Sequence, residues 1–423
     1  MHCCVKDKGV NMIDLKLLRE DPEKIIANLE KHDPSFDARR LSELDKHARK
    51  IGVEIESLRK EKNELAKKAS DGITDQLRTQ SIEIGKKLKE LEREFVEKEK
   101  ELENLYLSCP NILQDSVPEG GKEKNKVIKT VGKKPEFSFP VKNHVDIAQA
   151  LGWIDFESVS KITAPHFALY KGDGVKALYS LMLFMLKNNI AHGFLPILPP
   201  YMVNEESLQI AGNFPKFKED VYSIKGENLY MTPTSEVNLT NMYRNQILPE
   251  DQLPLKMTSW TSCFRREAGG YGAAERGLIR IHQFEKVELF SICTPEKSND
   301  ELDRMISCAE TILAKLGLHY RISLLAAQDC SFPSSKTYDI EVWMPGQKTY
   351  FEVSSASNCL DFQARRGKIR YRDKKTSKTC YVNTLNASSL ALPRLLVALL
   401  ETYQQEDGTV KLPDVIFKEG VSW

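Results

Sequence analysis

The chain has 423 residues, of which 41% are hydrophobic and 29% charged, a length that can hold one large core and an appendage. The lack of a long apolar run excludes a membrane span, and a formal net charge of only +1 means that a nucleic-acid partner must be met by local basic patches. Nine scattered cysteines without a CxxC spacing argue against a disulfide framework or a zinc site and favour a reducing cytoplasm.

The first 11 residues, MHCCVKDKGVN, have no apolar segment of the kind found in signal peptides. We expect residues 1–11 to form a disordered leader, because nothing in them can pack. The adjacent Cys3 and Cys4 leave a metal or lipid site as the alternative, although no partner motif lies nearby.

Residues 12–110 predict a helical arm. The apolar spacing over residues 14–29 fits two short helices. Over residues 41–69, and again over residues 77–105, apolar residues recur at alternating spacings of three and four. This pattern predicts an antiparallel coiled-coil hairpin covering about 41–105. At about 1.5 Å per residue each helix would be roughly 40 Å long, so we expect the hairpin to contact a partner.

Basic residues gather toward the turn of this hairpin. They are Lys67, Lys68, Arg78, Lys86, Lys87 and Lys89. Two interpretations stay open: the cluster grips a phosphate backbone, or it is the solvated surface of a coiled coil.

A compositional boundary follows the hairpin. Residues 111–140 are rich in Pro, Gly and Lys and lack periodicity, so we expect a linker between the arm and a domain covering residues 141–423. In that domain, residues 175–190 predict a strongly apolar helix that leads into a strand ending at Pro200. This helix and strand indicate either core packing or a subunit interface.

Residues 263–289 predict a strand, a glycine-rich loop and a second strand. Arg265 and Glu267 precede the loop glycines, which are Gly269, Gly270 and Gly272. The second strand presents polar and aromatic side chains on one face: Arg280, His282, Phe284, Lys286 and Glu288. Arg265 suits a phosphate or carboxylate because its fork can bond two oxygens, and Phe284 offers a flat surface for a base. The expected ligand is a nucleotide.

A second polar group stands where a strand gives way to a helix, in residues 229–241. Thr234, Ser235 and Glu236 are placed there either to hold a small polar ligand or to cap the helix. Residues 363–378 carry eight Lys or Arg against one Asp and predict either an RNA-facing patch or a solvated hairpin.

Two charged residues near the C-terminus suit a nucleotide site. Glu352 lies in a predicted strand and is a candidate Mg²⁺ ligand, with a strand-edge charge as the alternative. Arg394 falls in the first turn of an apolar helix, where a buried guanidinium needs an anion or a stacked base.

Long motifs stand at four places in the chain. They are MIDLKLLREDPE, TPTSEVNLTN, FRREAG with RGLIRIHQFEKVE, and YDIEVWMPGQ with EVSSASNCLDFQARR. In this order, and together with the coiled-coil arm, they resemble the seryl-tRNA synthetase family, bacterial type, of the class II aminoacyl-tRNA synthetases. The resemblance extends over nearly the whole chain from Met12.

One region departs from the family pattern. Where the family usually reads HTLNGSGLA followed by GR, this chain has NTLNASSLA followed by LPR. The departing residues are Asn383, Ala387, Ser389 and Pro393. We expect Pro393 to be harmless in the first turn of a helix, and Ala387 and Ser389 to narrow the floor of the amino-acid pocket.

The resemblance implies an α+β fold, with a class II synthetase core of an antiparallel sheet flanked by helices, preceded by the antiparallel coiled-coil hairpin. It implies a cytoplasmic homodimer, joined through the helix of residues 175–190 and the strand ending at Pro200, with no membrane association. The implied activity is the ATP-dependent activation of L-serine to seryl-adenylate, with Mg²⁺ as cofactor, and transfer of the seryl group to the 3' end of tRNA(Ser).

The resemblance also implies roles for individual residues. The catalytic residues would be Arg265 at the α-phosphate, Glu267 at the adenine amino group, and Arg394, which would sandwich the adenine with Phe284. Glu352 and Ser355 would hold Mg²⁺. The ATP site would consist of Arg265, Arg266, Glu267, Ile281, His282, Gln283, Phe284, Glu352, Val353, Ser354, Ser355 and Arg394. The serine site would consist of Thr234, Ser235, Glu236, Arg265, Glu288, Asn386 and Ser388.

Two other classes of protein compete with this interpretation. Enzymes that load amino acids onto carrier proteins are related, but as a family they lack the long arm. A noncatalytic scaffold could keep the fold, although the presence together of Arg265, Glu288, Glu352 and Arg394 argues against it. Serine-dependent pyrophosphate exchange, with and without tRNA, is the most informative single measurement.

Overall fold

The computed structural model describes residues 13–267 and 277–420. The expected leader of residues 1–11 and the glycines of residues 269–272 lie outside this part. The chain divides into two compact units, Met1–Pro110 and Asn111–Trp423.

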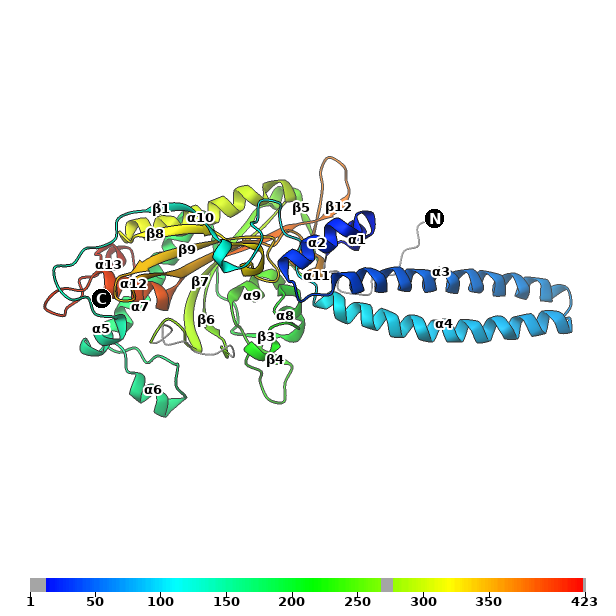
Figure 1. Ribbon diagram of the computed structural model, residues 1–423, viewed down its shortest axis with the longest axis horizontal. Helices are drawn as coiled ribbons and strands as arrows, with labels where there is room; N and C mark the ends of the chain where they lie inside the picture. Colours follow the sequence, from blue (N-terminus) through cyan, green and yellow to red (C-terminus); the bar gives the residue numbers. More distant parts are fainter. Residues whose placement is uncertain (1–12, 268–276, 421–423) are drawn as a thin grey trace. The chain divides into compact units, whose positions relative to one another are not determined.

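The first unit is helical. Its elements are α1 (Leu15–Glu20), α2 (Pro22–His32), α3 (Ala38–Lys68) and α4 (Asp75–Leu107), and α3 and α4 run side by side (Figure 1). The Asp37 side chain caps α3 by accepting from the N–H of Arg40, and the Thr74 hydroxyl caps α4 by accepting from the N–H of Leu77. The 31 residues of α3 correspond to roughly 46 Å of helix. The predicted coiled-coil hairpin is confirmed.

Apolar residues and ion pairs join the two long helices. Ile51 and Ile55 of α3 are buried against Ile84 and Leu88 of α4. Three pairs cross between the helices at their edges: Arg40–Glu101 at 2.5 Å, Arg59–Glu92 at 2.7 Å and Lys87–Glu54 at 2.7 Å. Exposed pairs of this kind each contribute about 0.2–1 kcal/mol, so the apolar seam is the main source of stability.

The second unit is built on an eight-stranded sheet. Its strands, in spatial order, are β1 (Lys126–Val131), β8 (Tyr320–Leu324), β9 (Lys336–Met344), β10 (Thr349–Asn358), β13 (Asn383–Ala391), β7 (Gln283–Cys293), β6 (Leu255–Phe264) and β2 (Leu195–Ile197). Neighbouring strands pair antiparallel except β2 and β6. Two small sheets accompany it: β12 (Thr379–Tyr381), β11 (Arg370–Arg372) and β5 (Ile247–Pro249), and β3 (Met202–Asn204) with β4 (Leu229–Met231).

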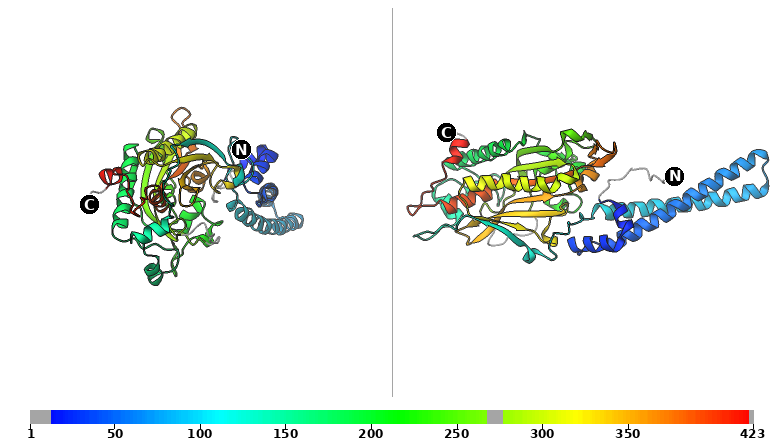
Figure 2. Two further views of the ribbon diagram at one scale, coloured as in Figure 1. Left: turned by 60° about the vertical axis from the view of Figure 1, so that its left-hand side comes forward. Right: turned by 90° about the horizontal axis from the view of Figure 1, so that it is seen from above.

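Helices cover both faces of the large sheet (Figure 2). The helices α7 (Asp173–Ala191), α10 (Ser298–Lys315) and α12 (Leu392–Thr402) form the main apolar core with Val287 and Leu289 of β7. The helices α9 (Ser235–Asn241) and α11 (Phe362–Gly367) pack against Phe290 and Ile292 on the other face. The remaining helices are α5 (His144–Ala150), α6 (Phe156–Ile162), α8 (Glu205–Ala211) and α13 (Val415–Glu419). Since side chains alternate along a strand, Lys286 and Glu288 face the side of α9.

The expected linker of residues 111–140 differs in the structure. Val117 is buried with Leu325, and the Asn111 amide donates to the carbonyls of Pro333 (2.9 Å) and Cys359 (2.8 Å). Further on, β1 pairs with β8 and forms one edge of the sheet. The segment is therefore part of the second unit. Its strand was missed because β1 is exposed along most of its length and shows no apolar alternation.

Three other predicted elements differ from the structure. The strand expected to end at Pro200 is β2, which ends at Ile197. The basic segment of residues 363–378 begins in α11, where Gln363 and Arg366 are buried, and only its remainder forms a hairpin through β11 and β12.

The third difference is in the central hairpin. The strand β7 begins at Gln283, so Arg280 and His282 precede it instead of lying on it. Within the described ranges, no helix is long and apolar enough to cross a membrane.

Candidate active site

The polar face of β7 meets the start of α9. The Thr234 hydroxyl accepts a hydrogen bond from the backbone N–H of Glu236 (3.3 Å) and donates one to Oε2 of Glu288 (3.1 Å). The Nζ atom of Lys286 forms an ion pair with the same carboxylate. Thr234 is therefore a helix cap that also faces Glu288.

The side chain of Glu236 lies in the same site. Its Oε1 accepts hydrogen bonds from Nε2 of Gln363 (2.7 Å) and Nδ2 of Asn386 (3.0 Å). Burial, followed by the charge of Glu288, raises the pKa of Glu236 from 4.5 to about 7. Burial also raises the pKa of Glu288, an effect that Lys286 opposes. Because two carboxylates share one lysine, the site favours an added cation such as the ammonium group of an amino acid.

Ser388 and Ser235, two of the three remaining predicted serine-site residues, differ in their surroundings. Ser388 of β13 stands directly opposite Glu288 of β7, and its carbonyl accepts from the hydroxyl of Ser354 (2.5 Å). Ser235 is fully buried in the first turn of α9. Apart from Arg265, the predicted set thus comes from β7, β13 and α9 with its capping residue.

Arg265 lies between this site and the aromatic ring of Phe284. Its Nε donates to the carbonyl of Pro233 (3.2 Å), next to Thr234, and its guanidinium carbon is 5.2 Å from the Phe284 ring centroid. The guanidinium therefore covers one side of the ring and leaves the other side for the predicted stacked base. The structure brings the predicted phosphate ligand and the predicted stacking residue together.

Glu267 is held by Arg280, which was expected on the ligand-facing side of the strand and not as the partner of Glu267. The two side chains form an ion pair of 2.7 Å, and Glu267 adopts a left-handed backbone conformation with φ of 49°. The backbone of Arg265 makes two contacts with His282. The Arg265 N–H donates to the His282 carbonyl (2.9 Å), and the Arg265 carbonyl lies 3.0 Å from Nδ1 of the His282 ring. The segment before β7 thus continues the pairing of the hairpin.

Four of the predicted ATP-site residues do not join this cluster through their side chains. Ile281 and Val353 are buried in the apolar core, so only their backbone atoms are available to a ligand. Arg266 is half-exposed and lies 3.9 Å from Glu219. Gln283 is exposed at the first residue of β7.

Arg394 joins the start of α12 to the neighbouring strand. Its Nε donates to the carbonyl of Ile279 (3.2 Å), and one terminal nitrogen contacts both the carbonyl (3.0 Å) and the carboxylate (3.2 Å) of Glu352. Pro393 is tolerated beside it because it occupies the first turn of α12. The predicted contact of Arg394 with an anion is therefore met by Glu352.

An irregularity in β10 places Glu352 and Ser355 on one face. Residues three apart in a regular strand face opposite sides, but the β9–β10 register shifts between Glu352 and Ser354, so that Ser355 stands opposite Asp339. Burial, followed by the charge of Glu352, raises the pKa of Asp339, an effect that the neighbouring Ser355 hydroxyl opposes. Oδ1 of Asp339 is buried and has no hydrogen-bond partner among the described residues.

Asp339 lies beside the predicted Mg²⁺ ligands Glu352 and Ser355, although it is not among the residues predicted from the sequence. The one sequence pattern around Asp339 is its spacing of two from Glu341, and charges on an exposed strand also produce that pattern. The donor set of Asp339, Glu352 and Ser355 consists of oxygen atoms, which suit Mg²⁺. No group of three or more His, Cys, Asp or Glu side chains suited to a metal occurs within residues 13–267 and 277–420.

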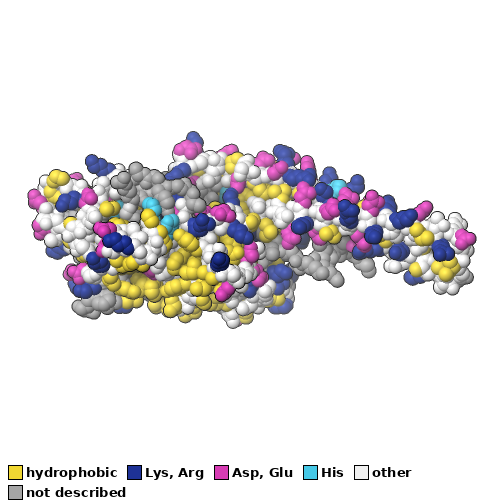
Figure 3. Space-filling model, turned by 90° about the horizontal axis from the view of Figure 1, so that it is seen from below, with side chains coloured by type: hydrophobic (Ala, Val, Ile, Leu, Met, Phe, Trp, Pro, Cys, Tyr) yellow, Lys and Arg dark blue, Asp and Glu magenta, His cyan; other side chains and the backbone are white. Residues whose placement is uncertain are grey.

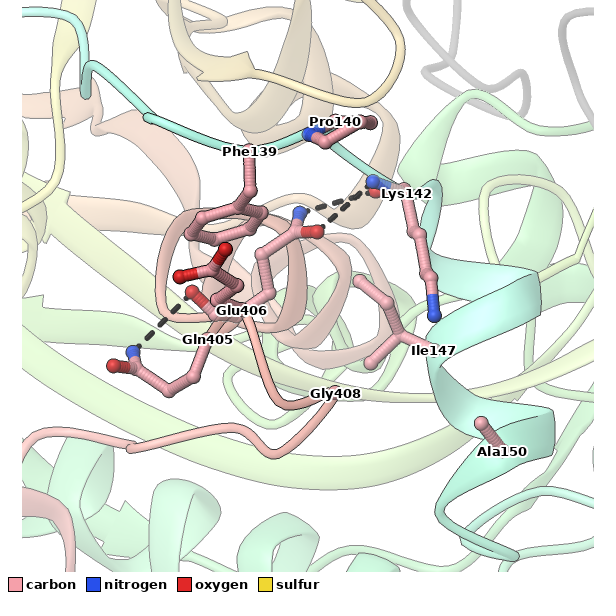
Figure 4. Close-up of a pocket in the computed structure, with 9 residues that line it drawn as sticks. Phe139, Pro140, Lys142, Ile147, Ala150, Gln405, Glu406 and Gly408 are labelled. Atoms are coloured by element: carbon pink, nitrogen blue, oxygen red, sulfur yellow. Dashed lines mark hydrogen bonds between the residues drawn. The ribbon is translucent and has the colours of Figure 1, made fainter.

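A cavity of about 210 Å³ lies elsewhere, between α5 and the end of α12 (Figure 4). Phe139, Lys142 and Ile147 are among the residues that line it, together with Glu406 and Gly408. None of the predicted site residues lines it.

Comparisons with known proteins identify the class of the fold and site. The model of the class II tRNA synthetase core domain of the G, H, P, S and T enzymes matches residues 217–403. The sheet, Arg265, and Arg394 at the start of α12 all lie in or beside that region. The second unit is a class II aminoacyl-tRNA synthetase core.

The arm and the full-length relatives give the family. The model of the seryl-tRNA synthetase N-terminal domain matches residues 12–113. The chain is 44% identical over 412 residues to the serine–tRNA ligase of Geobacter sulfurreducens (96% of this chain, 97% of that one), and 43% identical over 418 residues to serine–tRNA ligase 2 of Clostridium acetobutylicum (96% and 98%). It also resembles the crystal structure of seryl-tRNA synthetase from Pyrococcus horikoshii complexed with ATP (TM-score 0.90, 36% identity, covering 96% and 98%). The chain belongs to the seryl-tRNA synthetase family, and its activity is the ATP-dependent joining of serine to tRNA.

Proposed function

We propose that serine is activated where α9, β7 and β13 meet, with the residue roles that follow. The observation that carries this proposal is the position of Arg265, which contacts the Pro233 carbonyl beside the two buried carboxylates and the Phe284 ring on its other side. A guanidinium at this position can neutralise an α-phosphate while the carboxylate of serine lies next to it.

In the amino-acid site, Glu236 receives the ammonium group of serine. Its hydroxyl is bound by Glu288 and Ser388, which stand opposite each other on the adjacent strands β7 and β13. Alanine and glycine fit this site, but they leave its buried polar groups without a partner. That penalty discriminates strongly between substrates with and without a hydroxyl.

In the nucleotide site, the adenine stacks between Phe284 and Arg394, and Glu267, fixed by Arg280, contacts the adenine amino group. The serine carboxylate attacks the α-phosphorus and pyrophosphate leaves, a step that needs alignment and charge neutralisation but no general base. A hydroxyl of the terminal ribose of tRNA(Ser) then attacks the seryl carbonyl, and AMP leaves with the bonding electrons.

Mg²⁺ is the proposed cofactor, held by Glu352 and Ser355. The buried Oδ1 of Asp339, which lacks a partner among the described residues, supports the fit of a cation there. When bound, Mg²⁺ neutralises charge on the phosphates of ATP. Glu352 also positions Arg394 through the contacts of 3.0 and 3.2 Å described above.

Arg265→Ala tests the assignment of the site. We expect serine-dependent pyrophosphate exchange to fall on the order of 100-fold, because one such electrostatic contact is worth about 3 kcal/mol. Arg372→Ala is the matched control, since Arg372 is exposed on the short strand β11. Near-normal exchange in the Arg265 variant would contradict the assignment.

We further propose a homodimer in the cytoplasm, with the interface on α7 and the β2–β3 region. Apolar side chains gather on one side of the catalytic unit (Figure 3). Tyr179 is 43% exposed, Leu195 59% and Leu198 71%. Buried in an interface, such residues contribute about 25 cal/mol per Å². The cysteines in the described residues are free.

Leu198→Glu should shift the protein from dimer to monomer in light scattering after size exclusion. Ile162→Glu is the control, because Ile162 is equally exposed (72%) on α6. A monomeric parent protein, or an unchanged dimer in the Leu198 variant, would contradict this interface.

A further inference from the structure

A buried histidine and glutamate connect segments of the second unit that are far apart in the sequence. His144, the first residue of α5, is 1% exposed, and Glu401 of α12 is 0% exposed. Oε1 of Glu401 accepts from the backbone N–H of His144 (3.0 Å) and lies 3.2 Å from Nδ1 of its ring. Oε2 accepts from the N–H of Gly346 (2.8 Å). None of the roles proposed above includes either residue.

The second ring nitrogen defines the protonation of His144. Its Nε2 accepts a hydrogen bond from the backbone N–H of Leu278 (3.3 Å). A backbone N–H can only donate, so Nε2 carries the lone pair and Nδ1 carries the proton that faces Glu401. Glu401 thus orients the neutral ring, and the ring in turn fixes the backbone N–H of Leu278.

Gly277 shows how closely this segment rests on the ring. A β-carbon at position 277 would lie 2.3 Å from Nε2 of His144 and 2.6 Å from the Val145 side chain. Gly277 also has a φ of +70°, which side chains disfavour. The backbone at Gly277 therefore lies directly against the ring, with no room for a side chain between them.

The same segment carries contacts of the nucleotide site. The Ile279 carbonyl accepts from Nε of Arg394 (3.2 Å), and Arg280 is paired with Glu267 (2.7 Å). Arg394 and Glu401 lie two turns apart on α12, on the same side of the helix. The segment is thus attached to α12 at both ends: directly through Arg394, and through His144 to Glu401.

The start of α5 is itself fixed to the end of α12. Gln404 accepts from the N–H of Lys142 (2.9 Å) and donates to its carbonyl (3.1 Å), next to the cavity of Figure 4. Together with the Glu401 contacts, these bonds leave His144 little freedom to move. A ring held so firmly is suited to hold another segment in place.

We propose that His144, oriented by Glu401, is a positioning residue for the ATP-dependent step. By fixing the Leu278 backbone it places the Ile279 carbonyl and Arg280, and through them Arg394 and Glu267. The inference rests on the proposed function, in which Arg394 and Glu267 contact the adenine. It predicts an effect on ATP binding that is separate from serine binding, because no contact of His144 reaches Glu236 or Glu288 among the bonds described above.

Two substitutions at position 144 distinguish the roles of the two ring nitrogens. His144→Gln can place its amide oxygen where Nε2 accepts from Leu278, whereas His144→Asn reaches only the position of Nδ1 and loses that bond. We expect His144→Asn to raise the KM for ATP about tenfold, the equivalent of one hydrogen bond, with the KM for serine unchanged. His144→Gln should restore the KM for ATP to within about threefold of the parent value. His319→Asn is the control, because His319 is also a buried histidine and its Nε2 hydrogen-bonds to the Tyr350 hydroxyl (2.7 Å).

Thermal melting of all variants is measured beside the kinetics. A lower melting temperature in both His144 variants with an unchanged KM for ATP would overturn the proposal in favour of a purely structural role. Equal increases in KM for ATP and serine, or a glutamine variant no better than the asparagine variant, would also overturn it. Arg394→Ala is run in parallel: an unchanged KM for ATP there would contradict the proposed nucleotide site and not the positioning argument.

Discussion

Glu236→Gln provides a direct test of the electrostatics in the amino-acid site. Burial raises the pKa of Glu236 from 4.5 to about 7, so the folded protein holds this proton more tightly than the unfolded chain does. Its contribution to stability is therefore fully present below pH 4.5 and is lost as the pH rises to about 7. At about 1.4 kcal/mol per pKa unit, the loss amounts to at most roughly 3 kcal/mol.

The glutamine variant removes the titration but keeps the shape. Its amide oxygen can still accept the bonds from Gln363 and Asn386 that converge on Oε1. We expect the variant and the parent to have similar free energies of unfolding at pH 4.5, and the variant to be more stable at pH 8 by about 1–3 kcal/mol. The same change should raise the KM for serine at pH 8, because the ammonium group loses its anion.

Urea unfolding of both proteins at several pH values, followed by fluorescence, measures the difference. Glu219→Gln serves as control, since the Glu219 side chain is 91% exposed. Parallel pH dependence of stability for the parent and the Glu236 variant would refute the reasoning. Saturating serine should reduce the difference in free energy of unfolding between the variant and the parent at pH 8, because serine stabilises only a protein that binds it.

Two further predictions concern the metal site and the arm. Asp339→Asn should raise the melting temperature of the ligand-free protein, because it removes a buried carboxylate beside Glu352. It should also weaken Mn²⁺ binding about tenfold in electron paramagnetic resonance titrations with ATP. Unchanged Mn²⁺ affinity would exclude Asp339 from the site. Replacing residues 41–105 by a short linker should leave pyrophosphate exchange largely intact and remove tRNA charging; retained charging would show that the arm has another partner.

The sequence predicted the elements whose pattern is local. The coiled-coil hairpin follows from apolar spacing alone, and the strand-to-helix transition at Thr234 follows from a cap residue after a short strand. Resemblance to a family added the functional roles, which stay predictions. In the structure Phe284 and Glu288 lie on β7, and Arg265 directly follows the neighbouring strand β6.

What the sequence could not predict depends on contacts between distant segments. His144 and Glu401 are 257 residues apart, and nothing in the pattern around either residue indicates the other. The pairing of Ser355 with Asp339 depends on an irregularity of register, which a period of two cannot represent. The edge strand β1 was not predicted, because an exposed strand shows no apolar alternation in its sequence.

The departures from the family pattern at Ala387 and Ser389 show how strand alternation changes a prediction. From sequence, both residues were expected to narrow the floor of the serine pocket. In β13 it is Ser388 that stands opposite Glu288, whereas Ala387 stands opposite Leu289 and is part of the main apolar core. The Ser389 hydroxyl hydrogen-bonds to Asn189 of α7 (2.8 Å), which also lies on the core side. Neither residue therefore faces the pocket.

Restoring glycine at both positions should accordingly affect stability instead of specificity. The Ala387→Gly/Ser389→Gly variant loses a buried methyl group and a buried hydrogen bond, and it adds backbone freedom at two strand positions. We expect the free energy of unfolding to fall by roughly 2–3 kcal/mol. The KM for serine and the discrimination against threonine should stay within about twofold, because the atoms facing the substrate are unchanged. A change in either kinetic parameter at unchanged stability would mean that these side chains do reach the substrate.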